Sequence, residues 1–386
     1  MAALLFTVSC KKESDIIPAP DKAVTPPAET VPGKNVDECL STEGWDNGSI
    51  IPDQYIIALR EDSGQEGSIE SVESKIQKLR KLKSSNVQRV FTGRFRGFAA
   101  RLNHEEFREL SQDPSVAFIE PDRIVSVQSG CPVEISSQNI PWGIKRVGRG
   151  NGTGKRVWII DTGIELDHPD LNVDQKLSKS FVTGTTPNDD HGHGTHVAGI
   201  IGAKDNNFGV IGVAYNATVI ALKAMDHKGR GSVSNIIAAV QHAISSGKPG
   251  DVINMSLGGI TSSALDVEVK NAADKGYLFA VAAGNSSVDA GGASPARVQH
   301  KNIYTVSAMD STDTWAPFSN FGEVVDYCAP GVRIYSTFLN DGYSAMSGTS
   351  MAAPHVAGIL AIRGSVKTDG FVKDDPDNRP DPIAKF

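Results

Sequence analysis

The chain has 386 residues, of which 39% are hydrophobic and 22% are charged, and its formal net charge is −7. This length exceeds one ordinary domain, and the hydrophobic content is sufficient for a buried core. The acidic balance, without a basic stripe, excludes nucleic acid as an expected partner. No apolar run reaches the roughly 18 residues that a membrane-spanning helix needs.

Residues 1–10 form a short apolar segment that ends at Cys10 and is followed by two lysines. The segment resembles the end of a bacterial lipoprotein signal, in which Cys10 would be lipidated and would anchor the chain to a membrane. It departs from that pattern at Thr7 and in lacking a basic start. An ordinary signal peptide with an incidental cysteine is the alternative. Both interpretations predict an exported bacterial protein, either extracellular or in the cell envelope.

Residues 11–51 are predicted to be a linker. Prolines recur among Asp, Glu, Lys and Ala over much of this stretch. Such a composition buries too little apolar surface to order a core, so it favours an extended chain.

Residues 52–128 are predicted to be a small α+β domain. Apolar strand patterns alternate with helical spacing in the order β-α-β-β-α-β, which is typical of a ferredoxin-like fold. The strand patterns lie at 54–59, 90–102 and 116–122, and the helical patterns lie at 68–83 and 105–112.

Residues 138–386 are predicted to be an α/β domain with a parallel sheet between two layers of helices. Short apolar runs alternate with helical stretches, which favours parallel strands joined by helices. The tail from Asp369 is rich in Pro and Asp, and we expect it to lie over the surface or to be loose. The strand runs are 157–160, 219–222, 252–255, 278–282 and 303–307.

Three segments of this domain carry residues suited to nucleophilic catalysis. Asp161 ends a buried strand, where α/β sheets place their chemistry. His193 begins a helix of small residues, and a neutral imidazole is a base near pH 7. Ser350 follows a Gly-Thr turn at the start of another such helix, whose free N–H groups suit an oxyanion. Taken alone, Ser350 is equally well explained as a helix N-cap.

The three segments together resemble the subtilisin-like serine peptidases, and the resemblance runs from about residue 138 to about residue 362. It rests on Asp161-Thr162-Gly163, on His193-Gly194-Thr195-His196-Val197-Ala198-Gly199 and on Gly348-Thr349-Ser350-Met351-Ala352-Ala353-Pro354. The order Asp, His, Ser along the chain is that of subtilisin. The resemblance implies that Ser350 is the nucleophile, His193 the general base and acid, and Asp161 the orienting carboxylate.

A zinc site is the rival interpretation of His191, His193 and His196. Zinc peptidase motifs with closely spaced histidines also need a glutamate base, which this segment lacks. We therefore expect His191 to be a solvated loop residue and His196 to be a packed helix residue.

The same resemblance assigns an oxyanion donor and the substrate-binding edges. Asn285 follows an apolar strand and would donate to the oxyanion beside the Ser350 N–H. Substrate would add as a strand between two edges of the cleft. The residues assigned to these edges are Gly231 on one side and Ser256, Leu257, Gly258, Ala283 and Gly284 on the other.

The resemblance also implies a structural calcium site. The ligands would all be oxygens, which suits Ca²⁺. They would be the side chains of Gln138, Asp170 and Asn206 and the carbonyls of Lys204, Phe208 and Val210. A plain Asn-rich turn is the alternative.

In this context, residues 52–128 resemble the subtilisin propeptide, an intramolecular inhibitor and folding chaperone. The signature residues are Phe98, Leu102, Ile119, Glu120 and Asp122. Residues 129–137 would then be a processing linker, with a cut near Gln128 or near Ser136.

The remaining cysteines give two further expectations. Cys328 lies at a buried strand end and is expected to be a free core thiol. Cys39 and Cys131 flank the small domain and would be able to pair in an oxidising compartment.

The predicted function is that of an exported serine endopeptidase, made as a self-processed zymogen, that hydrolyses polypeptides with a broad, apolar P1 preference. A non-catalytic binding module with the same fold is the alternative, and labelling of Ser350 by a fluorophosphonate would separate the two.

Overall fold

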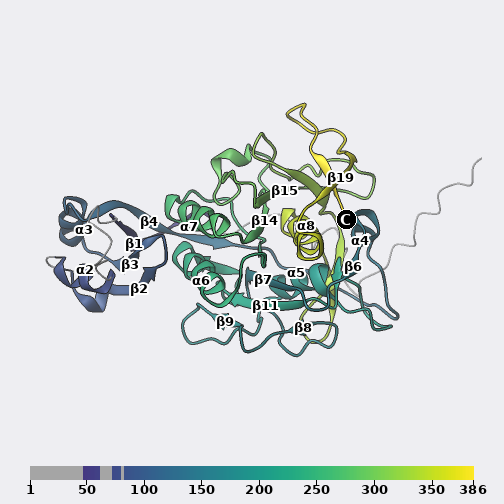
Figure 1. Ribbon diagram of the computed structural model, residues 1–386, viewed down its shortest axis with the longest axis horizontal. Helices are drawn as coiled ribbons and strands as arrows, with labels where there is room; N and C mark the ends of the chain where they lie inside the picture. Colours follow the sequence, from purple (N-terminus) through teal and green to yellow (C-terminus); the bar gives the residue numbers. More distant parts are fainter. Residues whose placement is uncertain (1–46, 61–71, 80–81) are drawn as a thin grey trace, which may run out of the picture.

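The computed structural model describes residues 47–60, 72–79 and 82–386, which form a small and a large lobe joined by one long strand (Figure 1). The predictions for Cys10 and Cys39, and those for nearly all of the 11–51 linker, lie outside the described residues. Within this part of the chain, no helix combines the length and the apolar character needed to cross a bilayer.

The small lobe has the predicted β-α-β-β-α-β order. Its antiparallel sheet contains β1 (Ile50–Leu59), β2 (Val87–Thr92), β3 (Arg96–Arg101) and β4 (Val116–Ser126). Two helices, α2 (Val72–Lys78) and α3 (His104–Ser111), pack on one face of this sheet. The helical pattern at 68–83 is thus described only from Val72 to Lys78, followed by a short 3₁₀ turn at Ser84–Asn86.

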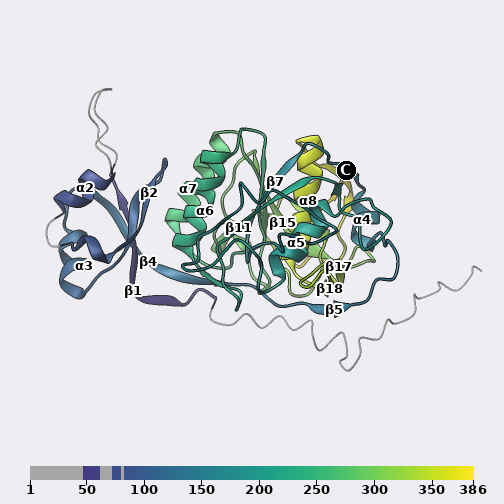
Figure 2. The same ribbon diagram turned by 90° about the horizontal axis from the view of Figure 1, so that it is seen from below.

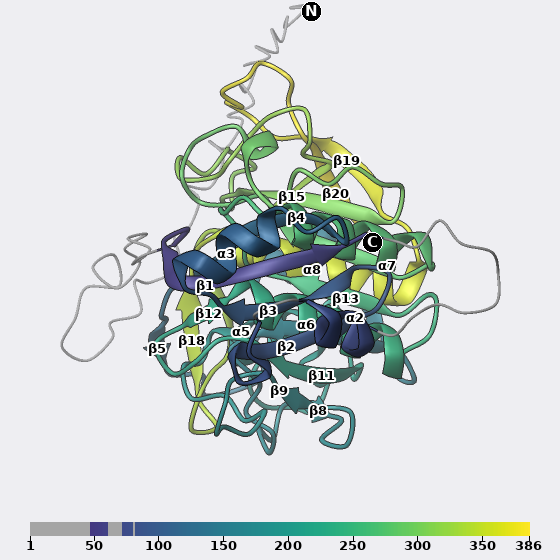
Figure 3. The ribbon, with the colours of Figure 1, turned by 90° about the vertical axis from the view of Figure 1, so that its left-hand side faces the viewer.

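Side chains of the small sheet alternate between two different cores. Ile57 and Phe98 pack with α2 and α3, whereas Ile56, Phe91 and Ala99 join a cluster that belongs mainly to the large lobe. Neighbours along a strand point to opposite faces, so one sheet fills both cores. Figure 3 shows this sheet lying in front of two helices of the large lobe.

The large lobe is built on a mostly parallel sheet that contains all five predicted strands. The strand order is β19-β20-β16-β15-β14-β13-β7-β11-β8, with β9 also paired to β11. The bounds are β7 (Arg156–Asp161), β8 (Asn172–Val173), β9 (Lys179–Ser180), β11 (Thr218–Lys223), β13 (Val252–Met255), β14 (Leu278–Ala282), β15 (Ile303–Met309), β16 (Tyr327–Pro330), β19 (Lys367–Phe371) and β20 (Pro382–Lys385).

Helices cover both faces of this sheet, as predicted. On one face α5 (His193–Gly202) and α8 (Thr349–Arg363) pack together, and on the other α6 (Val233–Ser246) and α7 (Ser263–Asp274) lie between the sheet and the small lobe (Figure 1). Strand β14 supplies Phe279 and Val281 to one core and Ala280 and Ala282 to the other. The short α4 (Trp142–Val147) precedes β6 (Gly150–Asn151), which pairs with β10 (Ala214–Tyr215).

Two segments that were expected to be irregular are strands. Within the 129–137 linker, β5 (Cys131–Val133) joins the hairpin of β17 (Ile334–Thr337) and β18 (Tyr343–Met346). The expectation of a loose tail is wrong, because β20 runs parallel to β16 and buries Ile383 and Ala384. The edge of the sheet left open by β16 explains this, since an unpaired edge can accept another strand.

Candidate active site

Asp161 and His193 are held together at the C-terminal end of β7. Asp161 is completely buried, and its Oδ1 lies 2.7 Å from His193 Nδ1 and accepts the Thr162 N–H at 2.7 Å. A Cβ at Gly194 would lie 2.0 Å from the Gly163 carbonyl oxygen, so only glycine lets the start of α5 approach this strand so closely. The contact presents Nδ1 to the carboxylate and leaves Nε2 for a substrate-side proton.

The start of α5 is held by Asp189, a residue that the motif does not identify. Its Oδ1 accepts the N–H groups of His191 and Gly192 at 3.0 Å, and its Oδ2 accepts the N–H and hydroxyl of Thr195. A carboxylate at a helix N-terminus satisfies free N–H groups and interacts favourably with the helix dipole. Asp189 therefore fixes the backbone that carries His193.

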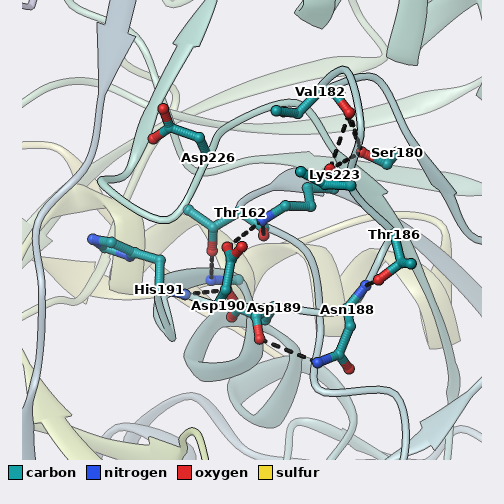
Figure 4. A network of polar contacts seen from close by, with 12 residues as sticks. Thr162, Ser180, Val182, Thr186, Asn188, Asp189, Asp190, His191, Lys223 and Asp226 are labelled. Atoms are coloured by element: carbon teal, nitrogen blue, oxygen red, sulfur yellow. Dashed lines mark hydrogen bonds and ion pairs between the residues drawn. The ribbon is translucent and has the colours of Figure 1, made fainter.

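Lys223 supports the same region from the neighbouring strand, opposite Asp161 in the register of β11 and β7. Its side chain is fully buried, and its Nζ donates to the Thr162 carbonyl at 2.6 Å and lies 2.5 Å from Asp190 Oδ1 (Figure 4). Buried charges persist where they are paired and hydrogen-bonded. The ammonium thus ties the strand end after Asp161 to the loop before His193.

Ser350 lies in the first turn of α8, beside the segment that follows β13. Its Oγ donates to the Ser256 carbonyl at 3.0 Å, while Ser256 Oγ donates to the Ser350 carbonyl at 2.7 Å. The Ser350 hydroxyl and His193 line one cavity of about 260 Å³. Rotation of the hydroxyl about its χ1 angle is what would bring it from Ser256 towards the imidazole.

Asn285 lines the same cavity and has a fixed orientation. Its Oδ1 accepts the N–H of Thr349 at 2.8 Å and the Thr349 hydroxyl at 2.9 Å, and that hydroxyl accepts the Gly284 N–H at 3.0 Å. Because its oxygen is held in this way, the amide presents its Nδ2 donor on the other side. Thr349 was not predicted, although its place beside the nucleophile was a usable signal.

The other residues assigned to substrate binding fall into three groups. Leu257, Gly258 and Gly284 line the cavity, whereas Ser256 contacts α8 and Ala283 is buried behind the wall. Gly231 lies in β12 (Arg230–Ser232), across from the others. No Asp or Glu lines the cavity among the residues that the structure describes.

The small lobe's last strand enters this cleft. Beyond the small sheet, β4 pairs antiparallel with β12, where Val125 faces Gly231 and the Val127 N–H donates to the Gly229 carbonyl at 3.0 Å. Gln128 then lines the cavity with His193 and Ser350. Residues 124–128, which we call the propeptide tail, therefore lie on the cleft edge to which Gly231 belongs.

Two carboxylates of β4 cap the helices beneath the small lobe. Glu120 accepts the Ser262 hydroxyl at 2.5 Å and the Ser263 N–H at 2.9 Å at the start of α7. Asp122 accepts the Ser234 N–H at 3.2 Å at the start of α6. Burial raises the pKa of both carboxyl groups above their usual range.

The three clustered histidines have different surroundings. His196 is fully buried with its Nε2 facing the carbonyls of Ile334 and Ser344, and burial lowers its pKa to about 3. His191 is not the solvated residue that we expected. It is half-buried, and a Cβ at Gly229 would lie 2.8 Å from its Nε2. Its pKa is lowered mainly by burial and, to a smaller extent, by the charge of His193.

The residues assigned to calcium meet in one place. Asp170 is fully buried, and its oxygens accept the Val210 N–H at 3.0 Å and the Asn206 amide at 2.9 Å. Gln138 Nε2 donates to the Lys204 carbonyl at 2.9 Å. The Phe208 N–H lies 3.3 Å from Asn206 Oδ1. Burial raises the pKa of Asp170 to about 6.

Cys328 is a buried thiol without a disulfide, as predicted, and burial raises its pKa. Cys131 is fully buried in β5. Its pairing with Cys39 stays a prediction, because Cys39 lies outside the described residues.

Comparisons with known proteins decide the family. Residues 152–370 match the subtilase family model, and residues 54–128 match the peptidase inhibitor I9 model. The chain belongs to the subtilase family. It is a subtilisin-like serine peptidase with an I9 propeptide domain on its N-terminal side.

Individual relatives agree with this assignment. The chain is 37% identical to the alkaline serine protease ver112 of Corniculantispora psalliotae, over 81% of this chain and 80% of the relative. It is 36% identical to alkaline serine exoprotease A of Vibrio alginolyticus, and the match spans 81% of this chain but only 60% of that relative's length. A crystal structure of a cold-adapted subtilisin-like serine proteinase matches with a TM-score of 0.51 and 38% identity, over 57% of this chain and 83% of that chain.

Proposed function

We propose that this protein is an exported serine endopeptidase that is made as a self-processed zymogen. The observation that carries the proposal is the course of β4, which leaves the inhibitor domain and brings Gln128 into the cavity of Ser350 and His193. A strand bound in this way resembles a substrate, because main-chain pairing with a sheet edge is how extended peptides are commonly held.

The reaction is acyl transfer. Ser350 attacks the peptide carbonyl, and His193 takes the hydroxyl proton and returns it to the leaving amine. Asp161, through its 2.7 Å contact with Nδ1, keeps the imidazole in one tautomer and stabilises the imidazolium. The Asn285 amide and the Ser350 N–H hold the oxyanion, and water then releases the acyl group.

The first substrate is the chain itself, and the cut falls inside the 128–137 window, near Gln128 or near Ser136. We propose a broad, apolar P1 preference, and the lack of a lining Asp or Glu among the described residues supports the part of it that excludes selection for a basic side chain. A peptide library varied at P1 and N-terminal sequencing of the mature enzyme would test these two assignments.

Ser350→Ala tests the function directly. The variant is expected to accumulate as the full-length chain, to lack peptidase activity and to resist labelling by a fluorophosphonate, while the wild type is labelled. A non-catalytic module would remain full-length and unlabelled even as the wild type.

A structural calcium ion would be held by six oxygen ligands. They are the side chains of Gln138, Asp170 and Asn206 and the carbonyls of Lys204, Phe208 and Val210. The fit rests on the buried carboxylate of Asp170 beside the Asn206 amide, and on the Lys204 carbonyl beside the Gln138 amide. The amides of Gln138 and Asn206 now direct nitrogen inward, and a half-turn of each would present oxygen instead. Calcium would supply loop stability there, away from the reacting atoms.

We further propose that Cys10 is lipidated before processing, so that the propeptide keeps the anchor and cleavage releases the enzyme. The full-length Ser350→Ala chain should then fractionate with membranes, whereas active enzyme should appear in the medium. If Cys39 pairs with Cys131 and the cut falls before Cys131, release should also need a reductant or degradation of the propeptide. A soluble full-length Ser350→Ala chain would contradict the anchor, and release without reductant would contradict the tether.

A further inference from the structure

The two edges of the cleft bind the propeptide tail, residues 124–128, through different hydrogen bonds. On the β12 edge, Val125 and Ser126 of the tail pair with Gly231 and Arg230 through a regular antiparallel register. On the opposite edge, the Gly258 carbonyl accepts its hydrogen bond at 2.9 Å from the side-chain nitrogen of Asn47. Among the described residues, no backbone hydrogen bond joins residues 124–128 to residues 256–259.

The Asn47 side chain lies between the propeptide tail and residue 258, where a further strand would pair with both. Its Nδ2 donates to Gly258, and its Oδ1 accepts the Ser126 N–H of the tail at 3.1 Å. The carboxamide therefore donates on one side and accepts on the other, as a peptide group does within a sheet. It also lines the cavity that contains His193 and Ser350.

The backbone after Asn47 places this side chain. The Gly48 N–H donates to the Ile124 carbonyl at 2.8 Å, and the Ile124 N–H donates to the Ser49 carbonyl at 2.9 Å. Gly48 has φ +83°, a conformation that favours glycine, and Arg123 donates to its carbonyl at 2.7 Å. Figure 2 shows this purple start of β1 running towards the large lobe beside β4.

The segment lies outside the inhibitor family's match, which begins at residue 54. We propose that residues 47–50 are a second inhibitory element, in which the Asn47 carboxamide closes the Gly258 edge of the cleft and slows departure of the cleaved tail. The proposal rests on the proposed zymogen function. The inhibitory group is a primary amide, which accepts the Ser126 N–H of the propeptide tail and donates to the Gly258 carbonyl of the peptidase.

The test uses full-length chains and the rate at which activity towards a small peptide substrate appears after self-cleavage. Asn47→Asp keeps the size and the turn preference of asparagine but removes the donor and places an oxygen against the Gly258 carbonyl. Activity should appear about three to ten times faster than in the wild type, the effect of losing one or two exposed neutral hydrogen bonds. Asn47→Ala should change the rate in the same direction.

Ser49→Ala is the matched control, since Ser49 contributes its backbone carbonyl and has an exposed side chain. It should activate at the wild-type rate. A second measurement is amide hydrogen exchange of Ser126 in the full-length Ser350→Ala chain, which should accelerate when Asn47→Asp is added.

Equal activation rates in Asn47→Asp and the wild type, equal effects of Ser49→Ala and Asn47→Asp, or unchanged exchange at Ser126 would each overturn the proposal. Failure of the zymogen function has a separate signature, because the wild-type chain itself would then neither cleave nor gain activity.

Discussion

The catalytic groups and the inhibitory lobe are attached to the sheet in different ways. Asp161 and His193 rest on contacts inside a continuous core, with 0% and 1% of their surface exposed. The small lobe is joined through an apolar face and a few separable polar contacts, including those of Glu120 and Asp122 with helix starts. Catalytic geometry thus depends on contacts that persist after processing. Inhibition depends on contacts that are lost when the cleaved propeptide separates from the peptidase.

The largest expected effect concerns the catalytic contacts of the large lobe, which persist after processing. Asn285→Ala should lower kcat by roughly 10²–10³ with little change in KM, which is the loss known for the oxyanion asparagine of subtilisin. The reason is that the oxyanion exists only near the transition state. Steady-state kinetics on a small peptide measure both constants. A rise in KM alone would contradict the assigned role.

The calcium loop is part of the permanent lobe but distant from its chemistry, so its effect should be on stability. Saturating calcium should raise the melting temperature by several degrees, since a ligand at 100 times its Kd stabilises by about 2.7 kcal/mol. Asp170→Ala should abolish that gain, and calorimetry with calcium and with a chelator measures it.

Asp205→Ala is the matched control for the calcium experiment. Asp205 is an exposed carboxylate of the same loop that is not among the assigned ligands. It should keep the calcium response. Equal melting temperatures for the wild type with calcium and with chelator would contradict the site.

Thr349→Val sharpens the argument about Asn285. It removes a hydroxyl that donates to Asn285 Oδ1 at 2.9 Å and accepts the Gly284 N–H at 3.0 Å, while the Thr349 N–H still donates to Asn285 Oδ1 at 2.8 Å. We expect kcat to fall about three- to ten-fold, because one of the two hydrogen bonds that orient the Asn285 amide is lost, with KM unchanged. A loss as large as that of Asn285→Ala would mean that the backbone donor alone cannot orient the amide.

The sequence predicted the sheet and both helical layers because apolar periodicity is a local signal. The motifs also singled out Asp161, His193 and Ser350, and the structure brings His193 into contact with Asp161 and into one cavity with Ser350. Lys223 and Asn47 were missed for a physical reason. Each acts through contacts with segments distant in the chain, such as the 211 positions between Asn47 and Gly258, and no local pattern encodes those contacts. Asp189 differs, because it accepts from residues two to six positions ahead, and an acidic residue before a helix was a usable local signal. β20 was missed for the same reason as Lys223 and Asn47, since its Pro- and Asp-rich surroundings indicate a loop unless the open edge at β16 is known.

The smallest expected effect concerns the separable contacts. Glu268 of α7 is buried, and its Oε2 accepts the Gln241 amide at 3.1 Å and the Phe95 N–H of the small lobe at 3.3 Å. Burial raises the pKa of its carboxyl group, while those two hydrogen bonds and the charge of Lys275 act in the opposite direction.

Removal of the small lobe would expose Glu268 to water and return its pKa towards the usual value, so the bound state favours the protonated carboxyl. A pKa raised by binding means that binding is strongest below the free group's pKa and weakens as pH rises through the raised value. The cleaved complex should therefore release its propeptide more slowly in mild acid than near neutrality. Glu268→Gln keeps a hydrogen-bonding side chain of the same size without titrating, and activation rates measured across this pH range should vary less in this variant. The same pH profile in Glu268→Gln and in the wild type would assign the dependence to Glu120 and Asp122 instead.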